Sequence, residues 1–206
     1  MPKSANLFSE LRRHWKDTAK IALETDEGKT YSYRDVLNRT AQLANSLNAA
    51  GLSPGDRVAV QVEKSPEALF LYLACLRAGG AYLPLNTAYT PAELAYFLAD
   101  AQPSLFVCRP AEEDIAADLC RKTGVAQRLT LGVKAEGSLM QLASGQRSVF
   151  KDVPRAADDL AAILYTSGTT GRSKGAMLTH GNLSANAHAL IETWRFTSDD
   201  VLLHAL

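Results

Sequence analysis

The clearest chemical signal in the chain is a run of glycine and hydroxyl residues that ends in a lysine. Residues 165–175 read YTSGTTGRSKG. Glycines let the backbone turn and bring its N–H groups towards an anion, and serine and threonine hydroxyls can donate to phosphate oxygens. Lys174 adds a compact positive charge on a long side chain. This combination predicts a phosphate-binding loop.

The order of the residues excludes two familiar phosphate loops. A Walker loop ends in Gly-Lys followed by Ser or Thr, whereas here Lys174 is followed by Gly175. A dinucleotide fingerprint needs Gly-x-Gly, and Gly168 is followed by two threonines. The remaining alternative is an ordinary polar loop between two strands. The specific order of the run favours the phosphate loop over that alternative.

Strand and helix patterns on either side would hold this loop at the end of a buried strand. Residues 160–165 are apolar enough for a central strand, and residues 175–178 form the expected return strand. A helix is expected from about residue 182 to residue 195, and residues 201–206 look like the start of another strand. The chain stops inside that apolar run, which suggests a piece of a longer protein.

The same alternation runs through the rest of the chain. A hairpin is expected around residues 21–31. Residues 32–35 resemble a capping box, with Asp35 in place of the usual glutamate, and start a helix that should stop at Gly51. Thr90 and Pro91 are expected to open a later helix. Residues 124–157 carry no clear pattern. Further strands are expected at 57–62, 81–84 and 105–108, and further helices at 66–78, 91–101 and 112–123. The alternation predicts an α/β fold with a largely parallel sheet and helices on both faces.

Composition narrows the class of protein. The chain has 206 residues, with 22 Lys and Arg against 22 Asp and Glu, and this balance argues against a nucleic-acid or anionic-membrane partner. It has no membrane-length apolar run and no signal-peptide pattern. Cys75, Cys108 and Cys120 form no CxxC pair, which suits a reducing compartment. A cytoplasmic location is therefore expected.

Several motifs resemble those of the adenylate-forming superfamily, which comprises acyl-CoA synthetases, adenylation domains of peptide synthetases and luciferases. Residues 166–175 resemble its signature phosphate loop, and residues 76–85, LRAGGAYLPL, resemble its upstream core motif. Asn86 stands where peptide-synthetase domains usually have an aspartate, which favours the CoA ligases. Residues 83–90 and 158–164 look most like malonyl-CoA synthetases. The resemblance spans essentially the whole chain.

This resemblance implies an ATP-dependent acid–thiol ligase that uses Mg²⁺ and takes CoA as co-substrate. A small carboxylic acid, malonate by the finer resemblance, would attack ATP to give an acyl-adenylate, and CoA would then displace AMP. Lys174 would be catalytic by stabilising the departing pyrophosphate. The residues implied to touch the nucleotide are Thr166, Ser167, Gly168, Thr169, Thr170, Gly171 and Lys174.

The resemblance also implies that residues 1–206 are an incomplete N-terminal domain and that the C-terminal domain is absent. The adenine, ribose and metal ligands and the catalytic lysine of the second domain would lie downstream, so no metal ligand is assigned. The isolated chain is expected to be inactive and to associate through apolar surfaces left uncovered. Two alternatives stay open: an amino-acid-activating domain, and a non-catalytic nucleotide-binding or interaction fragment.

A few other residues are weaker candidates. His180 follows the return strand and is expected to cap the next helix rather than to act in catalysis. Asp158 and Asp159 could form a metal pair, although a turn before a buried strand is the simpler interpretation. Trp194, together with Leu190 and Ile191, is expected in the core.

Overall fold

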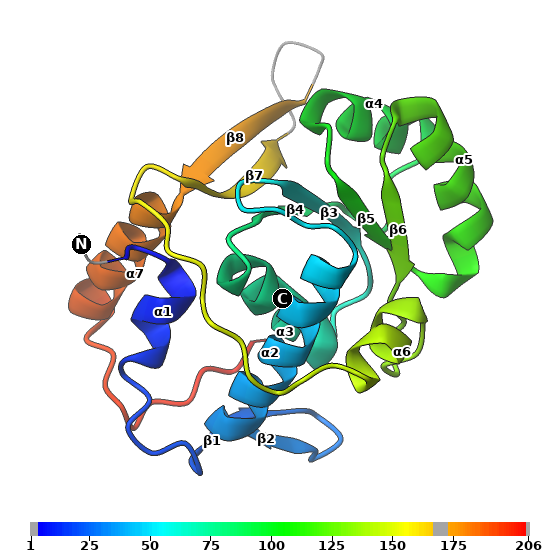
Figure 1. Cartoon of the computed structure of the whole chain (residues 1–206). Helices are drawn as coiled ribbons and strands as arrows, with labels where there is room; N and C mark the ends of the chain where they lie inside the picture. Colours follow the sequence, from blue (N-terminus) through cyan, green and yellow to red (C-terminus); the bar gives the residue numbers. More distant parts are fainter. Residues whose placement is uncertain (1–3, 167–172, 205–206) are drawn as a thin grey trace.

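A six-stranded sheet runs through the molecule and carries helices on both of its faces (Figure 1). The computed structural model describes residues 4–166 and 173–204. Neighbouring strands are parallel except for β7 and β8, which are antiparallel. Across the sheet the order is β6 (Gln127–Thr130), β5 (Leu105–Cys108), β3 (Arg57–Gln61), β4 (Ala81–Pro84), β7 (Leu160–Thr166) and β8 (Lys174–Thr179). The predicted fold, an α/β architecture with a largely parallel sheet, is confirmed.

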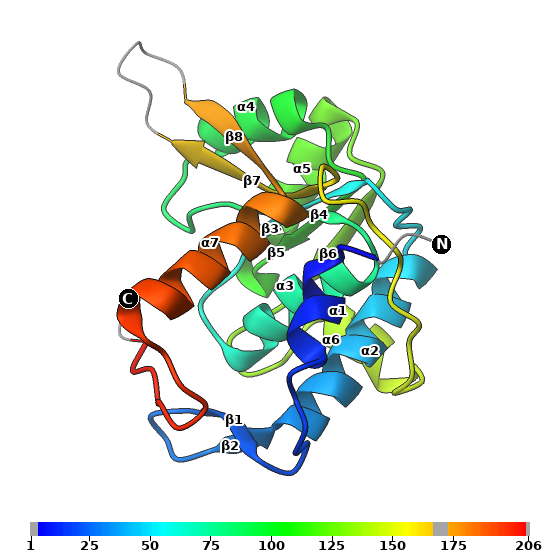
Figure 2. The same ribbon diagram turned by 90° about the vertical axis from the view of Figure 1, so that its left-hand side faces the viewer.

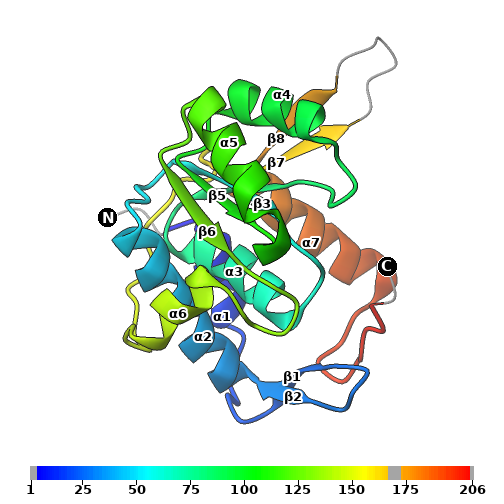
Figure 3. The same cartoon turned by 90° about the vertical axis from the view of Figure 1, so that its right-hand side faces the viewer.

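Each face of the sheet has its own apolar core. Along β5 the side chains alternate, so Leu105 and Val107 enter one core while Phe106 enters the other. The first core is covered by α1 (Leu7–Arg12), α2 (Tyr33–Ala49), α3 (Pro66–Arg77) and α6 (Ser138–Ser144), and the second by α4 (Pro91–Ala101) and α5 (Glu113–Thr123). Figure 3 shows α4 and α5 over the second face.

Local signals set the helix starts. The Ser32 hydroxyl accepts from the Asp35 N–H while the Asp35 carboxylate accepts from the Ser32 N–H, so the predicted capping box before α2 is confirmed. Thr90 and Glu93 form the same reciprocal pair before α4. The predicted hairpin is also present, as β1 (Ile21–Glu24) and β2 (Thr30–Ser32).

The region without a clear sequence pattern contains β6, α6 and an extended segment, residues 146–157, that crosses the helical layer (Figure 1). A buried ion pair holds this segment: Arg77 Nε donates to Asp152 Oδ1 at 2.8 Å, and both side chains are almost inaccessible. Further guanidinium N–H groups of Arg77 donate to the Leu37 and Phe150 carbonyls. Side-chain recognition of this kind has no local periodicity, so the sequence did not reveal it.

The end of the chain differs from expectation. Helix α7 (His180–Trp194) is present, but the strand predicted at 201–206 is wrong over residues 201–204, which form no strand. In Figure 2 the chain that follows α7 runs towards the β1–β2 hairpin and away from the edge strand β8, so this segment does not extend the sheet. Lys20 Nζ donates to the Ser198 carbonyl there.

The prediction that Trp194, Leu190 and Ile191 lie in the core is wrong for Trp194 and Ile191, while Leu190 is half-buried. Trp194 is 63% exposed and Ile191 is 49% exposed. The partly buried Leu183, in an early turn of α7, packs against the first core, whereas the exposed outer half of the helix has no layer over it among the described residues. Within the described part of the chain, no helix is long and apolar enough to span a bilayer.

Candidate functional site

The β7–β8 hairpin brings the two ends of the predicted phosphate loop together. Thr166 at the end of β7 and Lys174 at the start of β8 are paired Cα positions in the antiparallel ladder. Both residues are exposed, so a hydroxyl and an ammonium group are available beside the same opening. The other predicted loop residues lie outside the described residues: Ser167, Gly168, Thr169, Thr170 and Gly171.

This pair lies at the edge of the sheet where α/β proteins bind ligands. Strands β3, β4, β5 and β7 are parallel, so their carboxyl ends share one edge. Helix α3 covers one face of the sheet, while α4 and α5 cover the other. Such a reversal of helix side creates a crevice at the carboxyl edge. The donor set of Thr166 and Lys174 at this edge suits a polyphosphate anion.

Helix α4 contacts the chain on both sides of the loop, at Tyr165 near the end of β7 and at Ser173 just before β8; we call these two segments the stems of the loop. The Tyr96 hydroxyl donates to the Ser173 carbonyl at 2.9 Å, and the Tyr165 hydroxyl donates to the Asp100 carboxylate. The Tyr165 ring packs on Phe97 with centroids 4.5 Å apart. Burial, and next the bond to Asp100, raise the pKa of Tyr165 above its ordinary value, so its phenol stays protonated as a donor.

Gly175 has a packing role that its place in the motif does not suggest. It is paired with Tyr165 across the hairpin. A Cβ atom at this position would lie 3.0 Å from Ile163 Cγ2 and 3.3 Å from Tyr165 Cζ. The missing side chain therefore leaves room for the Tyr165 ring, in addition to any freedom it gives the loop.

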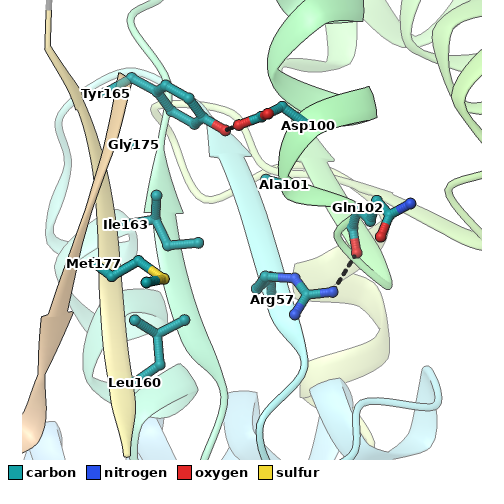
Figure 4. Close-up of a pocket in the computed structure, with 9 residues that line it drawn as sticks. All are labelled: Arg57, Asp100, Ala101, Gln102, Leu160, Ile163, Tyr165, Gly175 and Met177. Carbon is teal, nitrogen blue, oxygen red and sulfur yellow. Dashed lines mark hydrogen bonds between the residues drawn. The ribbon is translucent and has the colours of Figure 1, made fainter. Parts of the chain in front are cut away.

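A hollow of about 270 Å³ lies between α4 and the hairpin (Figure 4). The Tyr165–Asp100 hydrogen bond closes one end, and Arg57 donates to the Gln102 carbonyl at the other. The walls between them are largely apolar. The Asp100 carboxylate would repel an anion, and Arg57 already donates to the Gln102 carbonyl. This hollow is therefore less suited to an anion than the loop is. Its lining is Arg57, Asp100, Ala101, Gln102, Leu160, Ile163, Tyr165, Gly175 and Met177.

A second, open hollow lies directly at the carboxyl ends of β3 and β4. It is lined mainly by residues that follow these strands, Glu63 and Lys64 after β3 and Asn86 and Thr87 after β4. Arg109, which follows β5, donates to Glu63 at 2.9 Å and to the Thr87 carbonyl at 3.2 Å. Sequence reasoning did not single out these residues as a group, although their positions just beyond predicted strands were a usable signal.

His180 is a buried structural residue. Thr179, not His180, caps α7 with its side chain, so the prediction that the histidine is the cap is wrong. Its Nδ1 instead accepts from the Leu7 N–H at 3.1 Å, at the first turn of α1. Burial chiefly, and the charge of Arg155 next, lower the pKa of His180 to about 4. The imidazole is therefore neutral at pH 7 and links α1 to α7.

Asp159 takes part in the turn before β7. Its carboxylate accepts from the Ala156 N–H at 2.8 Å and pairs with Arg155 at 3.0 Å. The described residues contain no group of three or more His, Cys, Asp or Glu side chains arranged to hold a metal ion. The turn interpretation of Asp158 and Asp159 thus accounts for the observed contacts.

Comparison with known proteins adds independent findings. A family model described as AMP-binding enzyme matches residues 11–206. Among curated proteins, feruloyl-CoA synthase from Amycolatopsis sp is 37% identical over 171 residues, with 81% of this chain and 32% of that protein covered. Medium-chain fatty-acid–CoA ligase from Escherichia coli is 32% identical over 213 residues, with 95% of this chain and 37% of that protein covered.

Solved structures also match this chain closely. MatB from Rhodopseudomonas palustris in its apo form is 54% identical, with a TM-score of 0.95. The match covers 99% of this chain and 40% of MatB. The ATP-bound form of MatB matches with 55% identity and the same TM-score of 0.95. The chain thus spans about a third of these two curated relatives and 40% of MatB.

Proposed function

Because the chain belongs to the AMP-binding enzyme family, we propose that it is part of an acyl-CoA synthetase that works through an acyl-adenylate. The pairing of Thr166 with Lys174 at the carboxyl edge of the sheet carries this proposal. A free carboxylate is a poor electrophile, whereas the mixed anhydride formed with AMP reacts readily with the CoA thiol. The protein has to position these reactants and offset the charge that develops on phosphate.

Within such an enzyme, this chain would contribute the residues that bind the triphosphate of ATP. Residues 166–174 would surround the β- and γ-phosphates, with the Lys174 ammonium placed to stabilise the pyrophosphate as it leaves. Thr166 would donate its hydroxyl to a phosphate oxygen from the opposite stem. The magnesium ion would enter with ATP and neutralise part of its charge.

We further propose malonate as the carboxylate and CoA as the acyl acceptor. The resemblance of residues 83–90 and 158–164 to malonyl-CoA synthetases supports this choice, as does the high identity with MatB along the chain. A cytoplasmic location fits the three free and buried cysteines. Relatives with other acids in their names also match, so the assay has to compare several acids.

Two measurements test the proposal. The first is the affinity of this chain for MgATP, by titration calorimetry, with Lys174→Ala as the matched variant. The second is thioester formation by the protein as expressed from its gene, with malonate, methylmalonate, acetate and ferulate offered separately. Malonyl-CoA with stoichiometric AMP is the expected product. Exchange of pyrophosphate into ATP that depends on an amino acid, without CoA thioester, would instead identify an amino-acid-activating enzyme.

A further inference from the structure

Two side chains of α4 reach the two stems of the phosphate loop from one helix face. Tyr96 and Asp100 are four residues apart, so they lie on neighbouring turns of the same face. Tyr96 donates to the Ser173 carbonyl, just before β8, and Asp100 accepts from Tyr165, just before the end of β7. Figure 4 shows the Asp100 contact across the top of the hollow. One rigid element is therefore tied to both ends of the loop.

Helix α4 is firmly anchored to the body of the protein. Phe97 and Leu98 are almost fully buried in the second core. The capping box of Thr90 and Glu93 secures its first turn. The outer strand of the hairpin faces solvent, since Met177 is 71% exposed and the first four residues of β8 are all exposed. The position of the hairpin tip relative to the sheet thus depends on what α4 contributes.

We propose that Tyr96 and Asp100 are positioning residues that hold the paired Thr166 and Lys174 at a set position relative to the sheet before the phosphate ligand arrives. Holding the two stems in place lowers the ordering cost of binding, because less freedom is lost when the anion is gripped. The identity of the anion as the triphosphate of ATP rests on the proposed function. The contacts of Tyr96 and Asp100 with the stems do not depend on the proposed function, because they are present in the free protein.

The two contacts differ in strength, which makes graded variants possible. The Tyr165–Asp100 hydrogen bond has a charged acceptor, and such bonds are stronger than neutral ones. The Tyr96–Ser173 bond joins neutral groups. Asp100→Asn keeps an oxygen that can accept from Tyr165, whereas Asp100→Ala removes the acceptor. Tyr96→Phe removes only a hydroxyl and leaves the ring in place.

Amide hydrogen exchange in the absence of nucleotide tests the hold directly. In Tyr96→Phe, peptides that span residues 164–176 should exchange about fivefold faster, the factor expected for one ordinary hydrogen bond. In Asp100→Ala the increase should be larger, because the lost bond has a charged acceptor. Exchange in β3 and β5 should not change. Asp100→Asn should lie near wild type. Tyr89→Phe is the matched control, because its ring packs on the same Phe97 with centroids 4.8 Å apart.

Two results would overturn the inference: unchanged exchange at residues 164–176, or an equal rise in β3 and β5, which would indicate general loss of stability. MgATP affinity of the same variants gives the second readout, with binding about fivefold weaker in Tyr96→Phe and weaker still in Asp100→Ala. Equal affinities would refute the positioning role. If wild type binds no MgATP while the exchange pattern holds, the hold on the stems stands and the proposed function fails.

Discussion

The centre of the sheet and the β7–β8 hairpin differ in burial and in the interactions that hold them. All four residues of β5 are buried, whereas the first four residues of β8 are exposed. The centre is held by apolar packing on both faces, and the hairpin tip by one helix and a few polar contacts. Stability and the proposed chemistry are therefore carried by different parts of the molecule. Binding loops generally belong to the less stable parts of a fold.

The largest effect should come from removing a side chain at the centre of the sheet. Phe106→Ala should lower the free energy of unfolding by about 3–5 kcal/mol, because a buried ring leaves a cavity. Met177→Ala on the exposed strand should change it by less than about 0.5 kcal/mol. Urea unfolding of both variants measures this. Comparable losses would mean that the hairpin is as much a part of the cooperative core as β5 is.

A second large effect concerns the segment 146–157. Asp152→Ala should cost about 3 kcal/mol, because it leaves the buried guanidinium of Arg77 without its carboxylate. Thermal unfolding would measure the loss. Asp118→Ala is the control, since its ion pair with Arg121 is exposed and contributes little. If both variants melt alike, the buried pair does not anchor this segment.

A functional change should appear without a stability change at the hairpin. Lys174→Ala should lower adenylation tenfold or more, about 1.4 kcal/mol or more of lost stabilisation, while the melting temperature stays within a degree or so because Lys174 is exposed. Pyrophosphate release by the protein as expressed from its gene is the assay for the rate. Unchanged release would remove Lys174 from the chemistry. A lowered melting temperature would mean that its effect is structural.

The smallest predicted effect is a pH dependence from His180. Its folded pKa of about 4 lies below the ordinary value near 6.5, so the unfolded chain binds a proton first as the pH falls. The stability associated with this neutral histidine is therefore present above about pH 6.5 and is lost between about pH 6.5 and 4.

Between pH 7 and pH 5.5 the loss from His180 should be about 1 kcal/mol. Chemical denaturation at the two pH values measures it, with His180→Asn as control because an amide oxygen can replace Nδ1 as acceptor for Leu7. Identical pH slopes in the two proteins would show that His180 does not contribute.

Local sequence was sufficient for several features that neighbouring residues set, although it missed Thr179 as the cap of α7. The capping residues Ser32 and Thr90 marked helix starts that the structure confirms. The apolar run before Thr166 predicted a strand, and β7 is that strand. The participation of Thr166 and Lys174 in phosphate binding remains a prediction, although the structure does place them side by side.

Contacts between distant segments were beyond the reach of local patterns. The Tyr96–Ser173 hydrogen bond joins residues 77 positions apart, and the Tyr165–Asp100 bond joins residues 65 positions apart. The Arg77–Asp152 ion pair joins residues 75 positions apart. The predicted strand near the end failed for the same reason, because an apolar run becomes a strand only beside a free partner.

The sequence by itself determined the α/β alternation, the helix starts and the chemical character of residues 165–175, because these follow from backbone geometry, capping and residue type within a few positions. Only the tertiary structure decided that Trp194 is exposed, that His180 accepts from the first turn of another helix, and that Tyr96 and Asp100 stand against the loop stems. Those outcomes depend on which surfaces the folded chain brings together, and long-range packing is not encoded in local periodicity.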